Sequence, residues 1–194
     1  FARQGIDATT MADIAAAAGI SAPTVFNYFG SKDGILIAMI TEGTMEAREN
    51  DRTLHWREGD DLVGLITGLF LRVSTRTLEI AGKRVWRYAE AAVIRHPEAD
   101  FSRQYAAVSA ALIDVVADFF AEMSLTTRAG TDCAPEWLAR IFHDVWMPLF
   151  IRLITEEAET LADHQTALRL RLSPLVALIF TADCAAHPRR KATA

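Results

Sequence analysis

Apolar residues recur every three or four positions along most of this chain, and this period constrains the fold more than any other feature. Leu62, Ile66, Leu69 and Val73 form one such series. This spacing places side chains on one face of an α-helix. No stretch of strand length alternates apolar and polar residues in the way that a half-buried strand does. The sequence therefore predicts an all-α fold.

Glycine and proline residues mostly fall between the periodic segments, so they set the expected helix boundaries. Pro148 lies inside one predicted helix, which we expect it to kink, and Pro174 lies inside the last one. The chain begins within a helical pattern, so we expect further residues ahead of Phe1. The predicted helices cover residues 1–4 (the end of a helix), 10–18, 22–29, 32–52, 61–80, 83–95, 99–123, 136–156 and 161–185, with a junction at 53–59.

Composition narrows the class of protein. Hydrophobic residues make up 51% of the 194 residues and charged residues 23%, which allows a sizeable core and argues against disorder. The net charge of −5 argues against a generally basic surface that coats nucleic acid. Cys133 and Cys184 belong to no paired motif, so a reducing compartment is the plainer interpretation, although one disulfide stays open. No run of about 18 uncharged apolar residues predicts a membrane span.

Two short predicted helices, 10–18 and 22–29, are joined by a tight turn at Gly19, which is the pattern of a helix-turn-helix. Thr10 and Asp13 have capping-box spacing, and Pro23 falls in the first turn of the second helix. On that helix Val25 and Phe29 can face inward. The outward residues are small or form hydrogen bonds, which suits close approach to a DNA major groove; they are Ser21, which also caps the helix, Ala22, Thr24, Asn27 and Tyr28.

The next helix begins after Ser31, which caps it, and Lys32 in its first turn is well placed to bind a phosphate. The charge of this region is unusual for a DNA-binding segment. Four basic residues stand against seven acidic ones through Arg52, which gives a net charge of −3. We expect both that basic residues precede Phe1 and that the acidic side chains lie away from the DNA face.

The amino-acid sequence of this region resembles that of the DNA-binding domain of the tetracycline-repressor (TetR) family of bacterial regulators. The resemblance covers about residues 1–45 and rests on several pieces in the family's order and spacing. The pieces are Gly5-Ile-Asp-Ala-Thr-Thr-Met-Ala-Asp-Ile-Ala, Ala18-Gly-Ile-Ser, Thr24-Val-Phe-Asn-Tyr-Phe and Ser31-Lys-Asp-Gly-Ile-Leu. The remainder of the chain is similar to the family only in its helical character and length.

The resemblance implies a one-component regulator whose N-terminal helix-turn-helix binds an operator. It assigns Thr10, Tyr28 and Lys32 mainly to phosphates, and Ala22, Thr24 and Asn27 to base edges. Phe26 stands where the family often has tyrosine, so one phosphate-binding hydroxyl is absent. The turn at Gly30 lacks the extra basic residue often seen there. The full set of implied DNA-facing residues is Thr10, Ser21, Ala22, Thr24, Phe26, Asn27, Tyr28 and Lys32.

The same resemblance implies two domains: DNA binding at residues 1–52, and ligand binding with dimerisation at 53–194. Apolar pairs from Trp137-Leu138 to Leu153-Ile154 form a stripe wider than one core face needs, so we expect a homodimer through the last two long helices. An apolar or aromatic effector of moderate size is expected inside the bundle, with no cofactor. Its candidate contacts are Phe70, Trp86, Tyr88, Glu90, Tyr105, Phe142, His143 and Trp146.

Catalysis finds little support in the sequence. His143 and Asp144 are adjacent, so their side chains point about 100° apart on a helix and form no dyad by sequence alone. Asp183, Cys184 and His187 have a spacing that a metal could use, but no fourth ligand is evident, so no metal site is predicted. We expect a cytoplasmic transcriptional repressor and no membrane association. The alternatives are a helical enzyme without DNA binding and a regulator that acts through a protein partner.

Overall fold

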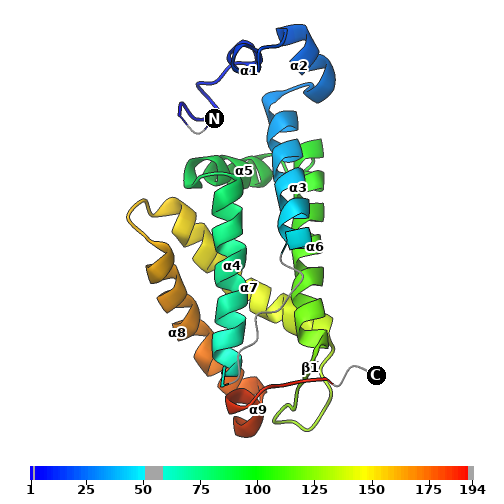
Figure 1. Ribbon diagram of the computed structural model, residues 1–194, viewed down its shortest axis with the longest axis vertical. Coiled ribbons are helices and arrows are strands. Elements are labelled where there is room, and N and C mark those ends of the chain that lie inside the picture. The colour runs from blue at the N-terminus through cyan, green and yellow to red at the C-terminus, as the bar shows by residue number, and fades with distance from the viewer. Residues whose placement is uncertain (2, 51–58, 192–194) are drawn as a thin grey trace. The chain divides into compact units, whose positions relative to one another are not determined.

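A computed structural model describes residues 1, 3–50 and 59–191, and most of these residues lie in helices, which confirms the all-α prediction (Figure 1). Within these ranges the only strands are β1 (Met123–Ser124) and β2 (Arg189–Arg190), which pair antiparallel. The helices are α1 (Met11–Ala18), α2 (Ala22–Phe29), α3 (Lys32–Asn50), α4 (Leu62–Ile80), α5 (Lys83–Arg95), α6 (Asp100–Ala121), α7 (Pro135–Thr155), α8 (Leu161–Ile179) and α9 (Ala182–Ala186).

The predicted helix boundaries agree closely with the observed ones for most helices, and α2 and α5 match to the residue. Residues 1–4, predicted to be the end of a helix, form turns where they are described, and the Gly5 N–H bonds to the Phe1 carbonyl (2.8 Å) as in a last helical turn, so this stays a prediction. The end of the predicted helix at Arg52 and nearly all of the junction at 53–59 fall outside the described residues.

The predicted helix over 161–185 is also wrong, since the chain leaves α8 at Phe180 and starts α9 two residues later. Phe180 is fully buried in an extended conformation (φ −103°, ψ 156°). Thr181 donates its N–H to the Thr126 carbonyl (3.0 Å), and its hydroxyl accepts the Cys184 N–H that begins α9. The contact with Thr126 joins segments more than 50 residues apart, so apolar periodicity within 161–185 does not reveal the break.

The chain divides into two compact units. Unit 1 comprises residues 1–50 and 77–108, and unit 2 comprises 51–76 and 109–194. Helices α4 and α6 therefore each contribute residues to both units. In unit 1, α3 closely approaches the last turn of α4, because a Cβ at Gly43 would lie 2.7 Å from Ile80 Cγ1. The domain division after residue 52 stays a prediction.

In unit 2 a buried hydrogen-bond network joins α4, α7 and α8. Ser74 Oγ donates to the Phe70 carbonyl (2.9 Å), and Trp146 Nε1 donates to Ser74 Oγ (2.9 Å). His164 Nε2 lies 2.9 Å from the same oxygen. Ser74 Oγ and His164 Nε2 thus share a buried hydrogen bond whose direction follows the tautomer of the imidazole. Burial lowers the pKa of the His164 imidazole, which favours its neutral form.

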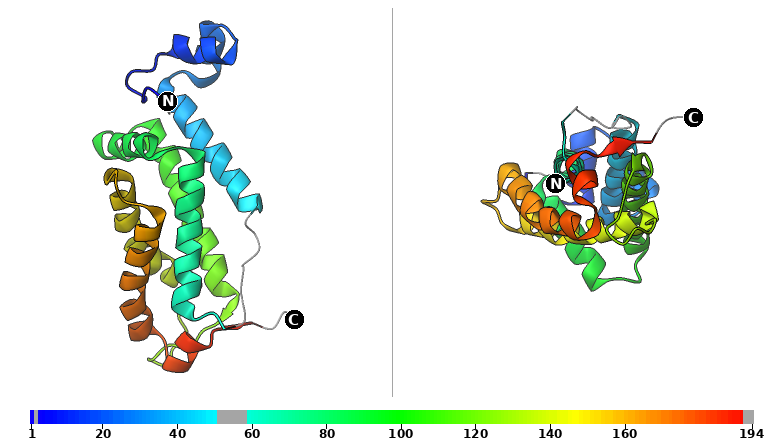
Figure 2. Two further views of the ribbon diagram at one scale, coloured as in Figure 1. Left: turned by 60° about the vertical axis from the view of Figure 1, so that its left-hand side comes forward. Right: turned by 90° about the horizontal axis from the view of Figure 1, so that it is seen from below.

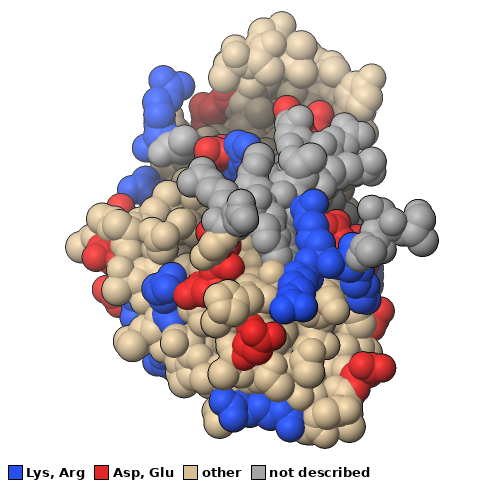
Figure 3. All heavy atoms as spheres, turned by 60° about the horizontal axis from the view of Figure 1, so that its bottom comes forward, with Lys and Arg blue, Asp and Glu red and all other residues tan. Residues whose placement is uncertain are grey.

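The surface of the described residues carries both signs of charge. On the face in Figure 3, basic and acidic side chains lie among one another over a broad uncharged surface. Helix α6 has an 18-residue window with a mean hydropathy of 1.4, so by length and composition it could cross a membrane. The sequence analysis predicted no such segment. A single helix of this kind also occurs in the cores of soluble proteins, so the finding does not assign α6 to a membrane.

Replacement of Ser74 should destabilise unit 2, because Ser74→Ala leaves the buried Trp146 N–H without its acceptor and the His164 imidazole without its hydrogen-bond partner. We expect the free energy of unfolding to fall by about 2 kcal/mol. Urea unfolding followed by circular dichroism measures the change. The matched control is Ser173→Ala on the exposed side of α8, which should change the value by no more than about 0.5 kcal/mol. Equal values for the two variants would contradict the network's contribution.

Candidate functional site

The short helix α1 begins at the capping box expected from the sequence. Thr10 Oγ1 accepts the Asp13 N–H (3.1 Å), and Asp13 Oδ2 accepts the Thr10 N–H (2.9 Å). The backbone hydrogen bond from Thr10, followed by the one from its hydroxyl, lowers the pKa of the Asp13 carboxyl. Asp13 therefore stays ionised and fixes the start of α1.

Helix α1 ends in a Schellman turn at Gly19. Gly19 has the left-handed conformation that favours glycine (φ 69°), with its N–H directed to the Ala16 carbonyl (3.3 Å). The N–H of Ile20 bonds to the Ala15 carbonyl (3.0 Å), which completes the motif. Figure 2 shows that the chain turns here from α1 directly into α2. The sequence prediction of a tight glycine turn between two short helices is confirmed.

Helix α2 is held at its start by Ser21 and on one side by Val25. Ser21 Oγ accepts the Thr24 N–H (3.2 Å), and Val25 is only 2% exposed. Phe29, which we predicted to face inward with Val25, is 42% exposed, so that prediction is wrong. Phe29 is the last residue of α2, and the chain turns away at Gly30 (φ 68°) before a neighbouring element can cover the ring.

The turn from α2 into α3 depends on an unusually close backbone approach at Gly34. Ser31 Oγ accepts the Gly34 N–H (3.0 Å), as expected for the cap of α3. A Cβ at Gly34 would lie 1.9 Å from the Phe29 carbonyl oxygen, which no side chain can tolerate. Gly34 therefore lets the last turn of α2 rest on the first turn of α3. Sequence reasoning missed this role, although a glycine in the first turn of a helix was a visible signal.

Lys32 is tied to the segment that precedes α1. Its Nζ donates to the Ile6 carbonyl (2.6 Å) and lies 3.3 Å from the Asp7 carbonyl. Thr9 Oγ1 donates to the Gly5 carbonyl in the same segment (2.6 Å). A charged donor strengthens such bonds, so Lys32 fixes the entry into α1 against the start of α3. An ammonium group has three hydrogens, so these two carbonyls leave one for a phosphate.

The structure brings the eight residues implied for DNA contact onto adjoining parts of unit 1: the start of α1, helix α2 and the start of α3. Tyr28 and Phe26 are the most open of the large side chains there, 81% and 59% exposed. The others divide into exposed Thr10, Ser21 and Asn27, and half-buried Ala22, Thr24 and Lys32. Whether they bind DNA stays a prediction at this point.

Helix α5 is attached to the first turn of α3. The Tyr88 hydroxyl donates to Asp33 Oδ1 (2.9 Å), and both residues belong to unit 1. Burial, and then the hydrogen bond to Asp33, raises the pKa of Tyr88 to about 12. The hydroxyl therefore stays protonated at neutral pH and keeps donating to the carboxylate. Asp33 is the residue next to Lys32, so α5 contacts the same turn that positions α2.

A second polar contact of α5 lies two residues further along, where Tyr105 of α6 donates its hydroxyl to Glu90 Oε1. Burial raises the pKa of the Glu90 carboxyl, and the hydrogen bond from Tyr105 opposes this shift in part. The Tyr105 ring lies 6.3 Å from Trp86 and 6.0 Å from Phe101, measured between ring centres. Trp86 Nε1 donates to the Thr77 carbonyl (2.7 Å). This cluster contains three of the residues predicted to bind an effector, Trp86, Glu90 and Tyr105, while Tyr88 lies against Asp33 in the same unit.

The other four predicted effector residues belong to unit 2. Trp146 stacks on Phe70 with ring centres 5.7 Å apart, and His143 lies 5.5 Å from Trp146. Phe142 is fully buried and stacks on Phe120 (5.2 Å). The predicted set is therefore divided equally between the two units, and its role in effector binding stays a prediction. His143 Nδ1 approaches Asp144 Oδ1 to 3.5 Å but has no hydrogen-bond partner within the described chain.

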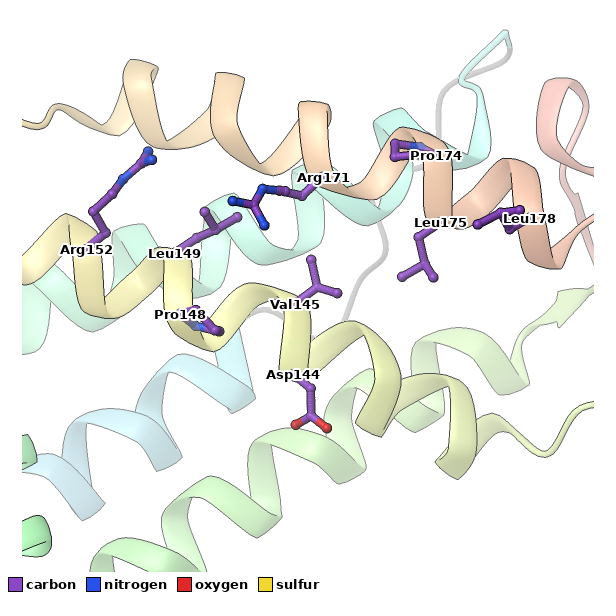
Figure 4. A pocket seen from close by; sticks show the side chains of 9 residues that line it. All are labelled: Asp144, Val145, Pro148, Leu149, Arg152, Arg171, Pro174, Leu175 and Leu178. Atoms are coloured by element: carbon purple, nitrogen blue, oxygen red, sulfur yellow. The ribbon is translucent and has the colours of Figure 1, made fainter.

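A groove of about 510 Å³ runs between α7 and α8 in unit 2 (Figure 4). Leucine, valine and proline side chains form its walls, with Asp144, Arg152 and Arg171 as its charged groups. Leu178 is 75% exposed and Leu170, two turns earlier on α8, is 73% exposed. Arg152 is engaged by Glu159 through two hydrogen bonds of 2.7 and 2.8 Å. An open apolar groove with opposite charges is typical of a surface that another macromolecule covers.

Metal and disulfide chemistry finds no site in the described part of the chain. No group of three or more His, Cys, Asp or Glu side chains there could hold a metal ion. Cys133 and Cys184 are both free thiols, with Cys184 buried. Asp183, one of the three spaced residues considered from the sequence as metal ligands, instead places its Oδ2 3.9 Å from Arg189 Nη2.

Residues 1–39 match the family model described as "Bacterial regulatory proteins, tetR family". This confirms the resemblance identified from the sequence. The matched segment contains α1, α2 and the first eight residues of α3, which are the elements that carry the predicted DNA-facing residues. No curated protein sequence matches the chain.

Several solved structures share the fold across most of the chain. A putative TetR-family transcriptional regulator from Rhodococcus sp. is 21% identical, with a TM-score of 0.62, over 91% of this chain and 92% of that one. Thermus thermophilus FadR, a TetR-family repressor in complex with lauroyl-CoA, is 21% identical (TM-score 0.64; 99% and 92% covered). Native NalD, the secondary repressor of the MexAB-OprM multidrug efflux pump in Pseudomonas aeruginosa, is 17% identical, with a TM-score of 0.57, over 94% of this chain and 92% of that one. The chain thus has the TetR-like fold.

The close approach at Gly34 gives a direct test of how α2 is held. Gly34→Ala should lower the free energy of unfolding by about 3 kcal/mol, because its Cβ would collide with backbone that cannot move independently. Gly68→Ala is the matched control, since an added Cβ there meets only the flexible Arg72 side chain at 3.5 Å. It should be neutral or stabilising, because alanine favours helix more than glycine does. Thermal and urea unfolding of both variants decide the matter, and a harmless Gly34→Ala would contradict the packing described.

Proposed function

We propose that this chain, which has the TetR-like fold and the family's N-terminal sequence, is a transcriptional regulator that binds operator DNA as a homodimer and releases it when a small molecule binds. The observation that carries this proposal is the form of α2. It is a short helix that is capped at its start and anchored by Val25. The side chains of Phe26, Asn27 and Tyr28 are exposed and take no part in the packing. The match over residues 1–39 covers this helix. We propose that the regulator is cytoplasmic and acts as a repressor.

Contact with DNA follows from the chemistry of the exposed groups. The Tyr28 hydroxyl, at the end of α2, and the remaining hydrogen of Lys32 can both bind phosphate oxygens. Helix α2 carries no charged residue, so base contacts and shape must supply much of the affinity. The rival regulator that binds a protein partner would use the same exposed aromatic side chains.

A second copy of the chain is the proposed occupant of the groove between α7 and α8. The groove has an acidic residue on α7 and an arginine on α8, Asp144 and Arg171. In a two-fold dimer the same surface of both protomers forms the interface. Asp144 of one protomer can then pair with Arg171 of the partner subunit, and the symmetry repeats this ion pair once more. Exposed Leu170 and Leu178 on α8 supply apolar area for the same contact. Dimerisation presents two α2 helices to successive half-sites of an operator.

The effector response would use the two contacts of α5. Glu90 and Tyr88 are two residues apart on this helix, so they point to different sides, toward Tyr105 and Asp33 respectively. A small apolar or aromatic molecule that separates Tyr105 from Glu90 would move α5 and with it the hold of Tyr88 on α3. The effector then favours the arrangement in which α2 is misplaced, and DNA affinity falls by a population shift. Helix α3 acts as the lever in this proposal.

Substitution of Tyr28 tests the DNA-binding face without disturbing the core, because its ring is 81% exposed. The probe is a duplex that the unmodified chain selects from a random DNA library. Tyr28→Ala should bind it about tenfold more weakly, since a hydrogen bond to a charged phosphate is lost. Asp118→Asn, an exposed change on α6 in unit 2, is the control and should bind as the unmodified chain does. Unchanged binding by Tyr28→Ala in electrophoretic shift assays would contradict the proposed face.

The dimer is tested by placing a charge in its proposed apolar contact. Leu178→Asp should convert the chain from dimer to monomer at micromolar concentration, because the partner's surface would bury an unpaired carboxylate. Analytical ultracentrifugation measures the mass. Ala162→Asp is the matched control, an exposed position in the first turn of the same helix, where aspartate is favourable. A dimer that survives Leu178→Asp would show that the groove is not the interface.

A further inference from the structure

We propose that α2 reads A·T base pairs, with the Asn27 amide on an adenine and the Phe26 ring against a thymine methyl group, and that it reads no guanine. This inference rests on the proposed function and specifies the operator that the chain recognises. It follows from which side chains α2 exposes, which of them already have partners, and which base edges the remaining ones fit.

The composition of α2 excludes the commonest guanine contact. Guanine presents the N7 and O6 acceptors in the major groove, and proteins usually read them with arginine or lysine. Helix α2 has the sequence Ala-Pro-Thr-Val-Phe-Asn-Tyr-Phe, with neither residue. Lys32, the nearest lysine after it, directs its ammonium toward the carbonyls of Ile6 and Asp7. The helix therefore offers no cationic side chain to a base edge.

The hydroxyl groups at the start of α2 are occupied by each other. Ser21 Oγ and Thr24 Oγ1 lie 2.7 Å apart, and Ser21 Oγ also accepts the Thr24 N–H. Their hydrogen-bonding capacity is therefore largely used in holding the helix start. This leaves two polar groups of α2 that no hydrogen bond within the described chain engages: the Tyr28 hydroxyl, proposed above to bind a phosphate, and the Asn27 carboxamide, which remains for a base.

The Asn27 side chain also points away from the core, as contact with a base requires. It follows buried Val25 by two residues, which is about 200° around a helix, so it points almost directly away from the core. A carboxamide that approaches a base edge in this way can donate to N7 and accept from the N6 amino group of adenine at once. Such a bidentate contact discriminates against the other three bases.

An apolar row runs beside Asn27. Ala22 and Phe26 are four residues apart and share one side of α2, while Pro23 and Asn27 share the adjacent side. Phe26 is 59% exposed, although exposure of an apolar phenyl ring to water is unfavourable. The C5-methyl group of thymine is the apolar feature of the major groove, and alanine and phenylalanine side chains contact it. The two rows together fit an adenine with a neighbouring thymine.

The test combines selection with a change in the DNA alone. The full chain selects duplexes from a random library, and the selected half-site should contain an adenine next to a thymine at the positions that α2 covers. Replacing that thymine by uracil removes only the methyl group and should weaken binding about fourfold. Phe26→Ala should bind the thymine and uracil duplexes equally. Because the uracil duplex is tested on the unmodified chain, this result does not depend on whether any variant folds.

Variants of Asn27 test the adenine contact. Asn27→Ala should relax the preference for adenine at one position in a repeated selection, and Asn27→Arg should replace that adenine by guanine. Asp118→Asn is the control and should select the same half-site as the unmodified chain. A half-site with G·C at the positions that α2 covers, insensitive to uracil and unchanged by Asn27→Ala, would overturn this inference but leave DNA binding intact. Failure to select any DNA would overturn the proposed function as well.

Discussion

An eight-residue helix is not stable by itself in water, so everything that α2 does depends on how its ends are held. Ser21 caps its start, Val25 is its one buried side chain, and Gly34 lets its last carbonyl rest on the next helix. The side of α2 opposite Val25 is therefore not needed for packing within the unit. Phe26 and Tyr28 can be exposed because α2 is held by its ends and by Val25 alone.

The same turn is contacted from three directions within unit 1. Lys32 binds the segment ahead of α1, Ser31 caps α3, and Asp33 accepts the hydroxyl of Tyr88 from α5. Three consecutive residues thus connect the entry into α1, the end of α2 and the helix that bears the Glu90 cluster. A change in the position of α5 must act on this turn, which gives a physical route from the aromatic cluster to α2 without any contact beyond the unit.

Local features of this fold were predictable from sequence, and distant ones were not. The caps at Thr10, Ser21 and Ser31 each bind the N–H three residues on, so their residue types reveal them. Helix periodicity placed Val25 and Phe29 on one face, but only the structure shows that the chain turns away before Phe29 is covered. Lys32 bonds to carbonyls some 25 residues earlier, and Ser74 meets His164 across 90 residues. Aromatic content likewise suggested effector candidates without revealing that they are divided between the two units.

The central claim is that α2 enters the major groove with the side opposite Val25 toward the bases. A crystal structure of the full chain with its selected duplex tests this claim most directly. We predict α2 in the major groove of each half-site, the Asn27 amide within hydrogen-bonding distance of adenine N6 and N7, and Tyr28 and Lys32 beside phosphates. A complex in which DNA contacts another part of the chain while α2 faces solvent or protein would contradict the account.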